Sequence, residues 1–159
     1  MAPHPDPWRA VDRQPDPAGY VRMMESRGRT PTQARVRRRF LRFCRVEPGW
    51  RVLEVGSGSG VVTRDLAALV GPRGHVTGVD RSRVLTEAAR RGAREAGLAR
   101  RVDFRRADAA ALPFRGGRFD CALAVTVLLH VARPQAMLRE LVRVTRPGGT
   151  LVICEFSSP

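Results

Sequence analysis

The ten residues RVLEVGSGSG at positions 51–60 decide the fold. The apolar run that includes Leu53 and Val55 is typical of a buried strand, and three glycines in the next five positions leave the following bend without side chains. A ligand can then touch the backbone of the bend and use the free amides where the next helix begins. A strand, a glycine loop and a helix in this order indicate the first unit of an α/β domain.

The same alternation of short β-branched runs and amphipathic stretches continues through the sequence. It predicts strands at 51–55, 75–79, 102–105, 119–125 and 150–155, with helices at 61–70, 83–96 and 135–145. Ser82 can cap the second of these helices, Gly97 can close it, and Pro134 suits the first turn of the third. The run RPGG at 146–149 predicts a sharp turn before the last strand. We therefore expect an open, doubly wound, mostly parallel sheet.

The sequence before residue 49 has a different character. Residues 1–17 contain five of the twelve prolines and almost no apolar periodicity, which predicts a flexible, proline-rich arm. Residues 18–48 are predicted to form N-terminal helices, at 18–27 and 32–45. The expected organisation is thus an arm, a helical segment and an α/β domain over residues 49–159.

Composition excludes several classes of protein. The 159 residues can bury a sizeable core without disulfides, and no apolar run approaches the ~18 residues of a membrane helix. The net charge is +14, but all 29 cationic residues are arginine, and residues 1–48 and 49–159 carry +6 and +8. Such an even bias gives no reason to expect a nucleic-acid partner. An odd number of cysteines and the lack of a secretory signal predict a reduced, cytoplasmic setting, and the cysteine spacing predicts no metal site.

Acidic residues lie at the ends of three successive predicted strands. Glu54 lies near the end of the first, Asp80 ends the second and Asp108 follows the third. Because ligands of such sheets bind outside the carboxyl ends of the strands, Asp80 is placed to accept the two hydroxyls of a ribose, and Asp108 to accept a hydrogen bond from an adenine amino group. Taken alone, Asp80 can equally cap a helix, and Asp108 is more often a turn residue.

Together, the three acids favour a ligand that carries an ammonium group, a ribose and an adenine. A dinucleotide fits poorly, because Val61 stands where the fingerprint G-x-G-x-x-G requires its last glycine. Glu54 would also repel a pyrophosphate.

Five stretches in this order carry a resemblance to a known family. They are RVLEVGSGSG, GVD at 78–80, ADAAALPF at 107–114, RFDCALAVTVLLHV at 118–131 and RVTRPGGTLVI at 143–153. The sequence resembles the class I S-adenosylmethionine-dependent methyltransferases, and within them the branch of the ubiquinone/menaquinone biosynthesis methyltransferases. The resemblance covers about residues 20–155. It implies a Rossmann-like methyltransferase fold, S-adenosyl-L-methionine as the cofactor and a small organic molecule as the methyl acceptor.

The resemblance also implies which residues bind the cofactor. The glycine loop and Glu54 would surround its methionine part, Asp80 would hold the ribose, and Asp108 would meet the adenine. The full set is Glu54, Gly56, Ser57, Gly58, Gly60, Asp80, Arg81, Asp108, Ala109, Val125 and Thr126. The family usually has Cys or another small residue at position 57.

No dedicated catalytic residue is required, because alignment of the acceptor with the S–CH₃ bond supplies most of the acceleration. His130, just past the fourth strand, is the first candidate for a general base toward a phenol or an amine. The alternative, a histidine hydrogen-bonded to nearby backbone, is the commoner arrangement. Tyr20 and Arg22 are candidates to close over the cofactor, although such residues more often pack or face water.

Members of that family continue past the fifth strand with another helix and an antiparallel pair of strands. Relative to them this sequence stops early, at Pro159, so we expect a sheet that lacks the usual C-terminal strands. The edge of the run LVI at 151–153 would then be open to pairing, which predicts a dimer, a companion chain that supplies the remaining strands, or a truncated product of poor solubility.

Two alternatives remain at this level. The first is a non-catalytic or truncated S-adenosylmethionine-binding module. The second, suggested by charge alone, is an RNA-directed methyltransferase that uses Arg35, Arg38 and Arg42.

Overall fold

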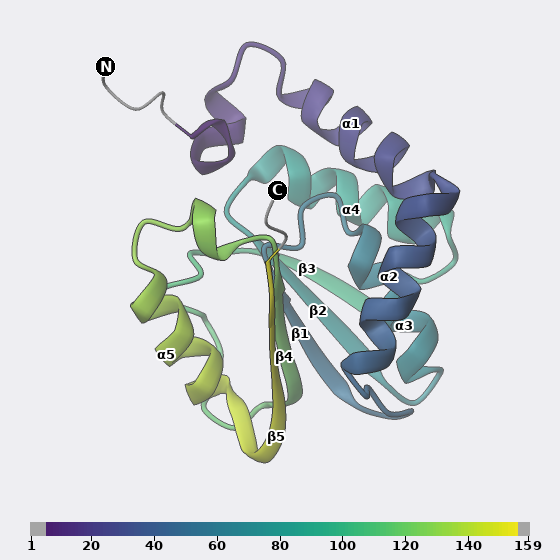
Figure 1. The fold of residues 1–159 in the computed structure, drawn as a ribbon, viewed down its shortest axis with the longest axis vertical. Helices are drawn as coiled ribbons and strands as arrows, with labels where there is room; N and C mark the ends of the chain where they lie inside the picture. The colour runs from purple at the N-terminus through teal and green to yellow at the C-terminus, as the bar shows by residue number, and fades with distance from the viewer. Residues whose placement is uncertain (1–5, 156–159) are drawn as a thin grey trace.

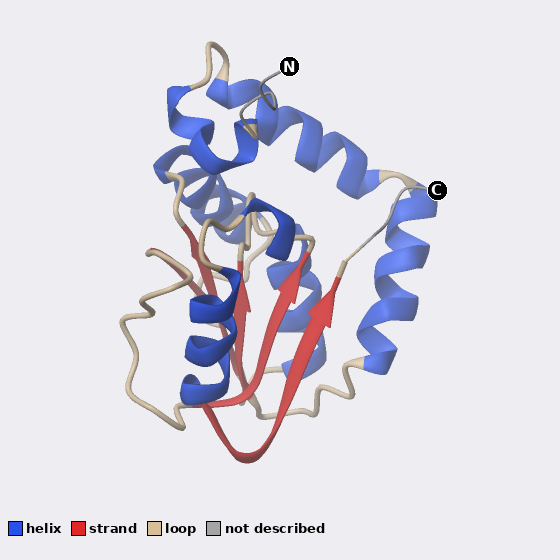
Figure 2. Ribbon diagram, turned by 60° about the vertical axis from the view of Figure 1, so that its left-hand side comes forward, coloured by secondary structure: helices blue, strands red, loops and turns tan. Residues whose placement is uncertain are grey.

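The protein is a parallel sheet of five strands between two layers of helices (Figures 1 and 2). The computed structural model describes residues 6–155. The strands are β1 (Arg51–Val55), β2 (His75–Asp80), β3 (Val102–Arg106), β4 (Phe119–Val125) and β5 (Thr145–Cys154). They lie in the order β3-β2-β1-β4-β5, and every neighbouring pair is parallel. The chain changes direction across the sheet between β1 and β4, where sheets of this type bind their ligands.

Helices cover both faces of the sheet. One face carries α2 (Pro31–Phe43), α3 (Val61–Val70) and α4 (Arg83–Glu95), and the other carries α5 (Pro134–Val144). A 3₁₀ helix, η1 (Pro7–Arg13), and α1 (Pro17–Arg29) precede them, and a second short helix, η2 (Leu128–His130), follows β4. In Figure 2 the arrowheads of the strands point toward η1 and α1, so these elements lie at the carboxyl edge of the sheet.

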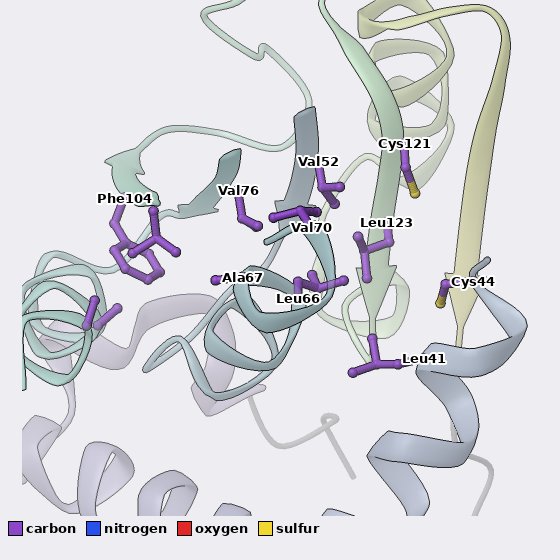
Figure 3. Close-up of a cluster of buried hydrophobic side chains, with 13 residues drawn as sticks. Leu41, Cys44, Val52, Leu66, Ala67, Val70, Val76, Phe104, Cys121 and Leu123 are labelled. Carbon is purple, nitrogen blue, oxygen red and sulfur yellow. The ribbon is translucent and has the colours of Figure 1, made fainter. Parts of the chain in front are cut away.

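The core has two parts, one on each side of the sheet. Val52 packs in the cluster that contains α3, whereas its neighbour Leu53 packs in the cluster that contains α5. This alternation follows because successive side chains of a strand point to opposite faces. Figure 3 shows the first cluster, in which Leu66 of α3 and Leu41 of α2 lie near Leu123 of β4. The sheet is therefore a fixed frame on which the residues at the strand ends are held.

The predicted α/β architecture and the main element boundaries are confirmed. Ranges 51–55, 61–70 and 119–125 form β1, α3 and β4 as expected. The Ser82 hydroxyl accepts a hydrogen bond from the Leu85 amide at 3.1 Å, which caps α4, and Gly97 just after α4 has a φ of +69°. Among the described residues no helix has the length and apolar character needed to cross a membrane.

The N-terminal segment differs from the flexible arm predicted over residues 1–17. Within its described part, Pro7–Arg13 form η1, and Val11 is buried at 2% exposure. The Asp6 carboxylate accepts a hydrogen bond from the Trp8 amide at 3.0 Å and begins the helix. Proline costs nothing in this first turn, because its missing N–H would have no partner there. The prediction for residues 1–5 lies outside the described residues.

β5 begins five residues earlier than predicted. The run at 146–149, which we expected to be a turn, belongs to the strand and contains an irregularity in its pairing with β4. The glycine at 149 is required there, because a Cβ would lie 2.7 Å from the Asp120 carbonyl oxygen. Among the described residues β5 pairs only with β4, and Leu151 and Ile153 on it are 40% and 37% exposed.

Candidate active site

A cavity of about 600 Å³ lies at the carboxyl edge of the sheet. Its floor is the loop after β1 together with the ends of β2 and β4. The segments after β3, β4 and β5 and the helices η1, α1 and α2 contribute its walls. Every residue predicted to bind the cofactor lines this cavity except Gly60, and His130 lines it as well. The strand ends therefore bring together residues that are 76 positions apart in the sequence, from Glu54 to His130.

Two glycines of the loop have left-handed backbone, and the contact at Gly56 also leaves no room for a side chain. Gly56 has a φ of +73°, and a Cβ on it would lie 2.2 Å from Cγ2 of Val127. Gly58 has a φ of +53°, and a Cβ on it would lie 2.1 Å from Cε of Met24 in α1. Both values favour glycine, because side chains are disfavoured in left-handed backbone.

Gly60 has a different role from the one predicted. It begins α3 with a φ of +81°, and a Cβ on it would lie 2.9 Å from the Phe104 ring and 3.0 Å from Ala89. Gly60 thus faces the core between α4 and β3 and not the cavity. Its contribution is to let the loop turn into α3 over a packed surface.

Glu54 is a buried carboxylate at the base of the cavity. It is 3% exposed, and the Thr63 hydroxyl of α3 donates a hydrogen bond to it. Burial raises the pKa of Glu54 to about 8, because the lowering effect of the Thr63 hydrogen bond is smaller and nearby Asp80 raises it further. A positive charge in the cavity would favour the ionised form, so a cationic ligand would bind with release of a proton.

Asp80 connects the glycine loop to α4. One of its carboxylate oxygens accepts the Gly58 amide at 2.9 Å, and the other accepts the Ser82 amide at 2.9 Å. Burial raises the pKa of Asp80 in spite of these hydrogen bonds. Because a carboxylate oxygen has two acceptor positions, each oxygen can accept one further donor from the cavity. Asp80 therefore both organises the start of α4 and lines the cavity.

Asp108 differs from the other two acids. Its side chain is 63% exposed, it accepts the Ala110 amide at 2.8 Å, and Arg133 lies 3.4 Å away. This is the local turn that the sequence left open as an alternative. Asp108 and Ala109 also line the cavity, so all three acids face one space, with Glu54 buried, Asp80 partly buried and Asp108 on the surface. The strand-end rule predicted their convergence but not this difference in burial.

His130 has a carboxylate partner instead of the backbone partner considered above. Its Nδ1 lies 2.8 Å from the Asp6 carboxylate, across 124 residues of sequence. The Trp8 ring, which lines the cavity, lies 6.0 Å from the His130 ring. Tyr20 packs edge-on against Trp8 and Arg22 pairs with exposed Asp16, and neither lines the cavity, as in the commoner alternative given above for these two residues.

Several lining residues were not predicted. They come from η1, α1, α2, the segment after β4 and the end of β5, and are Trp8, Met23, Met24, Gln33, Val36, Arg37, Phe40, Leu129 and Glu155. Glu155 accepts the amides of Val127 and Leu128 at 3.0 and 2.7 Å and so fixes the chain after β4. No spacing rule connects these segments in the sequence. Trp8, an aromatic residue inside the proline-rich stretch, is a signal that this stretch packs against the rest of the chain.

The cysteines lie apart from this chemistry. Cys44 and Cys121 are buried in the first core cluster, and burial raises their pKa values to about 11 and about 12. Such thiols are poor nucleophiles and poor metal ligands at neutral pH. Within the part of the chain that the structure describes, no group of three His, Cys, Asp or Glu residues is arranged to hold a metal ion.

Comparison with known proteins identifies the family. Residues 52–149 match the model of the methyltransferase domain. The chain belongs to this family. A methyltransferase of similar sequence is the ubiquinone/menaquinone biosynthesis C-methyltransferase of Ectopseudomonas mendocina, 39% identical over 114 residues, which are 72% of this chain and 44% of that protein. The corresponding enzyme of Pseudomonas aeruginosa is 37% identical over 114 residues, with the same shares. This methyltransferase chain thus spans less than half the length of these curated relatives.

Solved structures agree with the assignment. The [4+2]-cyclase SpnF is 36% identical with a TM-score of 0.71, over 79% of this chain and 47% of that one. An S-adenosylmethionine-dependent methyltransferase from Aquifex aeolicus is 22% identical with a TM-score of 0.72, over 84% of this chain and 69% of that one, and it shows the fold alone.

Proposed function

We propose that this chain binds S-adenosyl-L-methionine in the cavity and transfers its methyl group to a small organic acceptor. One observation carries the proposal: two carboxylates, the buried Glu54 and the partly buried Asp80, flank a glycine loop at the carboxyl edge of a methyltransferase-family sheet. Cofactor, activity and acceptor are all part of the proposal, because the relatives are more than twice as long as the matched region.

The residues present fit this cofactor. Glu54 faces the site of its ammonium group, and the spare acceptor positions of Asp80 suit the hydroxyls of its ribose. The Ser57 hydroxyl is buried without a hydrogen-bond partner among the described residues, as expected beside a polar ligand. The proposed binding residues are those predicted from the sequence, except that Gly60 supports the loop from the core side. The rest of the lining on this side of the cavity comes from Arg81, Asp108, Ala109, Val125 and Thr126.

The protein's chemical task is mainly to position the acceptor. When bound, the cofactor supplies an electrophilic methyl group. The glycine loop and the two acids would hold the cofactor in one orientation, and Trp8 of η1 with Leu129 and His130 of η2 line the part of the cavity that is left for the acceptor. Such alignment and the exclusion of water account for most of the acceleration of a transfer of this kind.

Calorimetric titration with S-adenosylhomocysteine tests the cofactor assignment. Asp80→Ala should weaken binding by about 1–3 kcal/mol, since hydrogen bonds to a charged acceptor are lost. The matched control is Asp103→Ala, which also removes a hydrogen-bonded carboxylate, one that accepts from Thr77 at 2.7 Å and does not line the cavity. Equal affinity of the wild type and Asp80→Ala would contradict the proposal.

Methyl transfer itself is tested with S-adenosylmethionine labelled on its methyl group. The chain is incubated with a panel of phenols, hydroquinones and amines, and label in the organic product supports the proposal. A second candidate function is cofactor binding without methyl transfer, favoured by the 36% identity to the [4+2]-cyclase SpnF. Binding of S-adenosylhomocysteine with no labelled product from any acceptor would favour this second function.

We also propose that the free edge of β5 pairs with a second copy of the chain or with a partner chain. The exposure of Leu151 and Ile153 on the last strand of the sheet supports this. Size-exclusion chromatography with light scattering measures the oligomeric state: a dimer that dissociates in the Leu151→Lys variant is expected, and a stable monomer would contradict pairing with a second copy.

We also propose a reduced, cytoplasmic setting for the chain, which is supported by its three free thiols.

A further inference from the structure

Helix α2 and the turn after it carry exposed arginines that no acidic side chain balances. Among residues 6–155 these arginines form no ion pair and no side-chain hydrogen bond, whereas Arg37 on the same helix pairs with Asp65 at 2.8 Å. Charge is spread evenly along the sequence, but the fold gathers five arginines on the solvent side of this one segment. They are Arg35, Arg38, Arg39, Arg42 and Arg45.

This arrangement leaves like charges next to one another. Arg35 and Arg39 are four residues apart, as are Arg38 and Arg42, so each pair consists of neighbours on the helix surface. Like charges at this spacing destabilise a helix. No acidic residue occurs at positions 26–46 to offset them. A polyanion that lies along α2 would relieve the repulsion.

An exposed aromatic ring lies among these arginines. Phe43 is 76% exposed, more than any other large hydrophobic residue that the structure describes as exposed. It lines a surface hollow together with Arg39, Arg42 and Arg45. Leu41, two residues earlier, is buried in the core cluster (Figure 3). The end of α2 therefore turns its aliphatic side chain to the core and its aromatic ring to solvent.

Guanidinium groups around an exposed ring match the chemistry of a single nucleic-acid strand. Arginine binds phosphate oxygens through two parallel hydrogen bonds. An unpaired base stacks on an aromatic ring or on a guanidinium plane. The bases of a duplex are already stacked on one another and would not reach Phe43. Unpaired strands in cells are mostly RNA, so RNA is the partner that this surface fits.

A membrane surface fits the same residues less well. A helix that lies in a membrane interface buries a broad apolar face among the lipids. The apolar face of α2 is already used inside the protein, where Leu41 is buried and Phe40 packs against the same cluster. On the solvent side, Phe43 is one ring among five arginines.

We propose that the arginine face, made of Arg35, Arg38, Arg39, Arg42, Phe43 and Arg45, binds single-stranded RNA. The arginines hold phosphates, and one base stacks on Phe43. Both contacts are available in any sequence, so the face has little sequence preference. None of its six residues lines the cavity, so this surface is separate from the proposed active site and does not depend on the proposed function.

The first test measures binding of a fluorescent oligouridylate of about 12 nucleotides to the full chain by fluorescence anisotropy. The affinity of the wild type should fall steeply with salt, by about 0.7 in the log–log slope for each phosphate contact. Arg39→Gln/Arg42→Gln should bind about tenfold more weakly at low salt, and its slope should be shallower by about 1.4, because two contacts are lost.

Arg91→Gln/Arg94→Gln on α4 is the matched control. It removes the same charge at the same spacing from two exposed arginines without ion pairs among residues 6–155. The whole chain carries a net charge of +14, so attraction by overall charge would weaken equally in the two double variants. The control should keep the wild-type slope. Equal losses in both double variants would overturn the inference.

The second test separates RNA from a membrane. Phe43→Leu keeps an apolar side chain but removes the ring, so its oligouridylate affinity should fall about tenfold at an unchanged salt slope, and Phe43→Trp should restore the affinity. Vesicles of phosphatidylcholine and phosphatidylglycerol are the other arm. If Phe43→Leu keeps wild-type affinity for oligouridylate and binds these vesicles as the wild type does, the inference is overturned in favour of an anionic membrane.

Binding of S-adenosylhomocysteine reports on the cavity in the same samples. Its affinity should be the same in the wild type and in all of these variants, because the substituted residues lie outside the cavity. Failure of the wild type to bind S-adenosylhomocysteine would contradict the proposed function and leave the RNA result intact. Failure of the wild type to bind oligouridylate at low salt would overturn the RNA inference alone.

Discussion

The two sides of the cavity are built in different ways. One side, the sheet wall, consists of Glu54, the loop 56–60 and Asp80, and it is held by backbone hydrogen bonds and by buried contacts. The other side, the N-terminal wall, consists of η1 and α1, and α1 has no buried residue. Polar contacts between elements hold this second wall, for example Glu25 of α1 with Arg64 of α3 at 2.9 Å.

The difference teaches which part of the site can change at low cost. The sheet wall shares its residues with the core, so a substitution there disturbs the fold as well as the ligand. The N-terminal wall is held mainly by polar contacts between partly exposed groups, with Val11 as its one buried residue in the described part of η1 and α1. An exposed ion pair contributes about 1 kcal/mol or less. We therefore expect the wall that faces the cofactor to be rigid and the wall that faces the acceptor to open locally.

The largest effect is expected from Gly56→Ala on the sheet wall. Its left-handed backbone and the 2.2 Å approach to Val127 should together lower the free energy of unfolding by about 2–4 kcal/mol. Gly97→Ala is the matched control, since its φ is +69° but no atom lies within 4 Å of the added Cβ. This control should cost about 1 kcal/mol. Denaturant unfolding measures both, and equal losses would show that the contact with Val127 is not tight.

A second effect concerns Glu54 and pH. Its pKa is raised to about 8 by burial, so the folded protein binds a proton that the unfolded chain has already released. The free energy of unfolding should therefore fall as pH rises from the unfolded pKa toward about 8, by about 2 kcal/mol between about pH 6 and pH 8. Glu54→Gln should lack this fall. Parallel pH profiles for wild type and Glu54→Gln would contradict the buried, protonated state of Glu54.

The sheet wall could be predicted because its residues follow from local rules. The strand, the glycine loop, Glu54 and Asp80 all lie within residues 51–80, and parallel strands bring their carboxyl ends to one edge. The error at Gly60 has a physical cause. All three glycines have positive φ, and only the packing of Phe104, 44 residues away in the sequence, decides that this one faces the core.

The N-terminal wall could not be predicted because its contacts are not local. Nothing in the sequence pairs Asp6 with His130, and the prolines there were counted as interruptions. Pro7 and Pro17 instead each begin a helix, with Asp6 and Asp16 as their caps, and Pro31 begins α2 with Thr30 as its cap, at the helix start that this proline indicates in the sequence. The pattern of an acid or threonine followed by proline was the available signal for these helix starts.

The smallest effect is expected from Asp12→Ala, which removes the contact of η1 with α4. The Asp12 carboxylate accepts the Ser82 hydroxyl and the amides of Arg83 and Val84. Burial by itself would raise the pKa of Asp12, but these hydrogen bonds lower it below its usual value, so the contact stabilises the fold above the unfolded pKa and is lost as pH falls.

We expect Asp12→Ala to cost about 1 kcal/mol of global stability, because it removes one helix-capping group. Amide exchange should accelerate in η1 while β1 and β4 stay protected. Glu87→Ala, which removes an exposed pair with Arg83 at 3.9 Å, is the control and should leave exchange in η1 unchanged. If amide exchange in Asp12→Ala accelerates equally in η1 and in the central strands, the N-terminal wall unfolds only together with the whole domain. The two walls would then not differ in local stability.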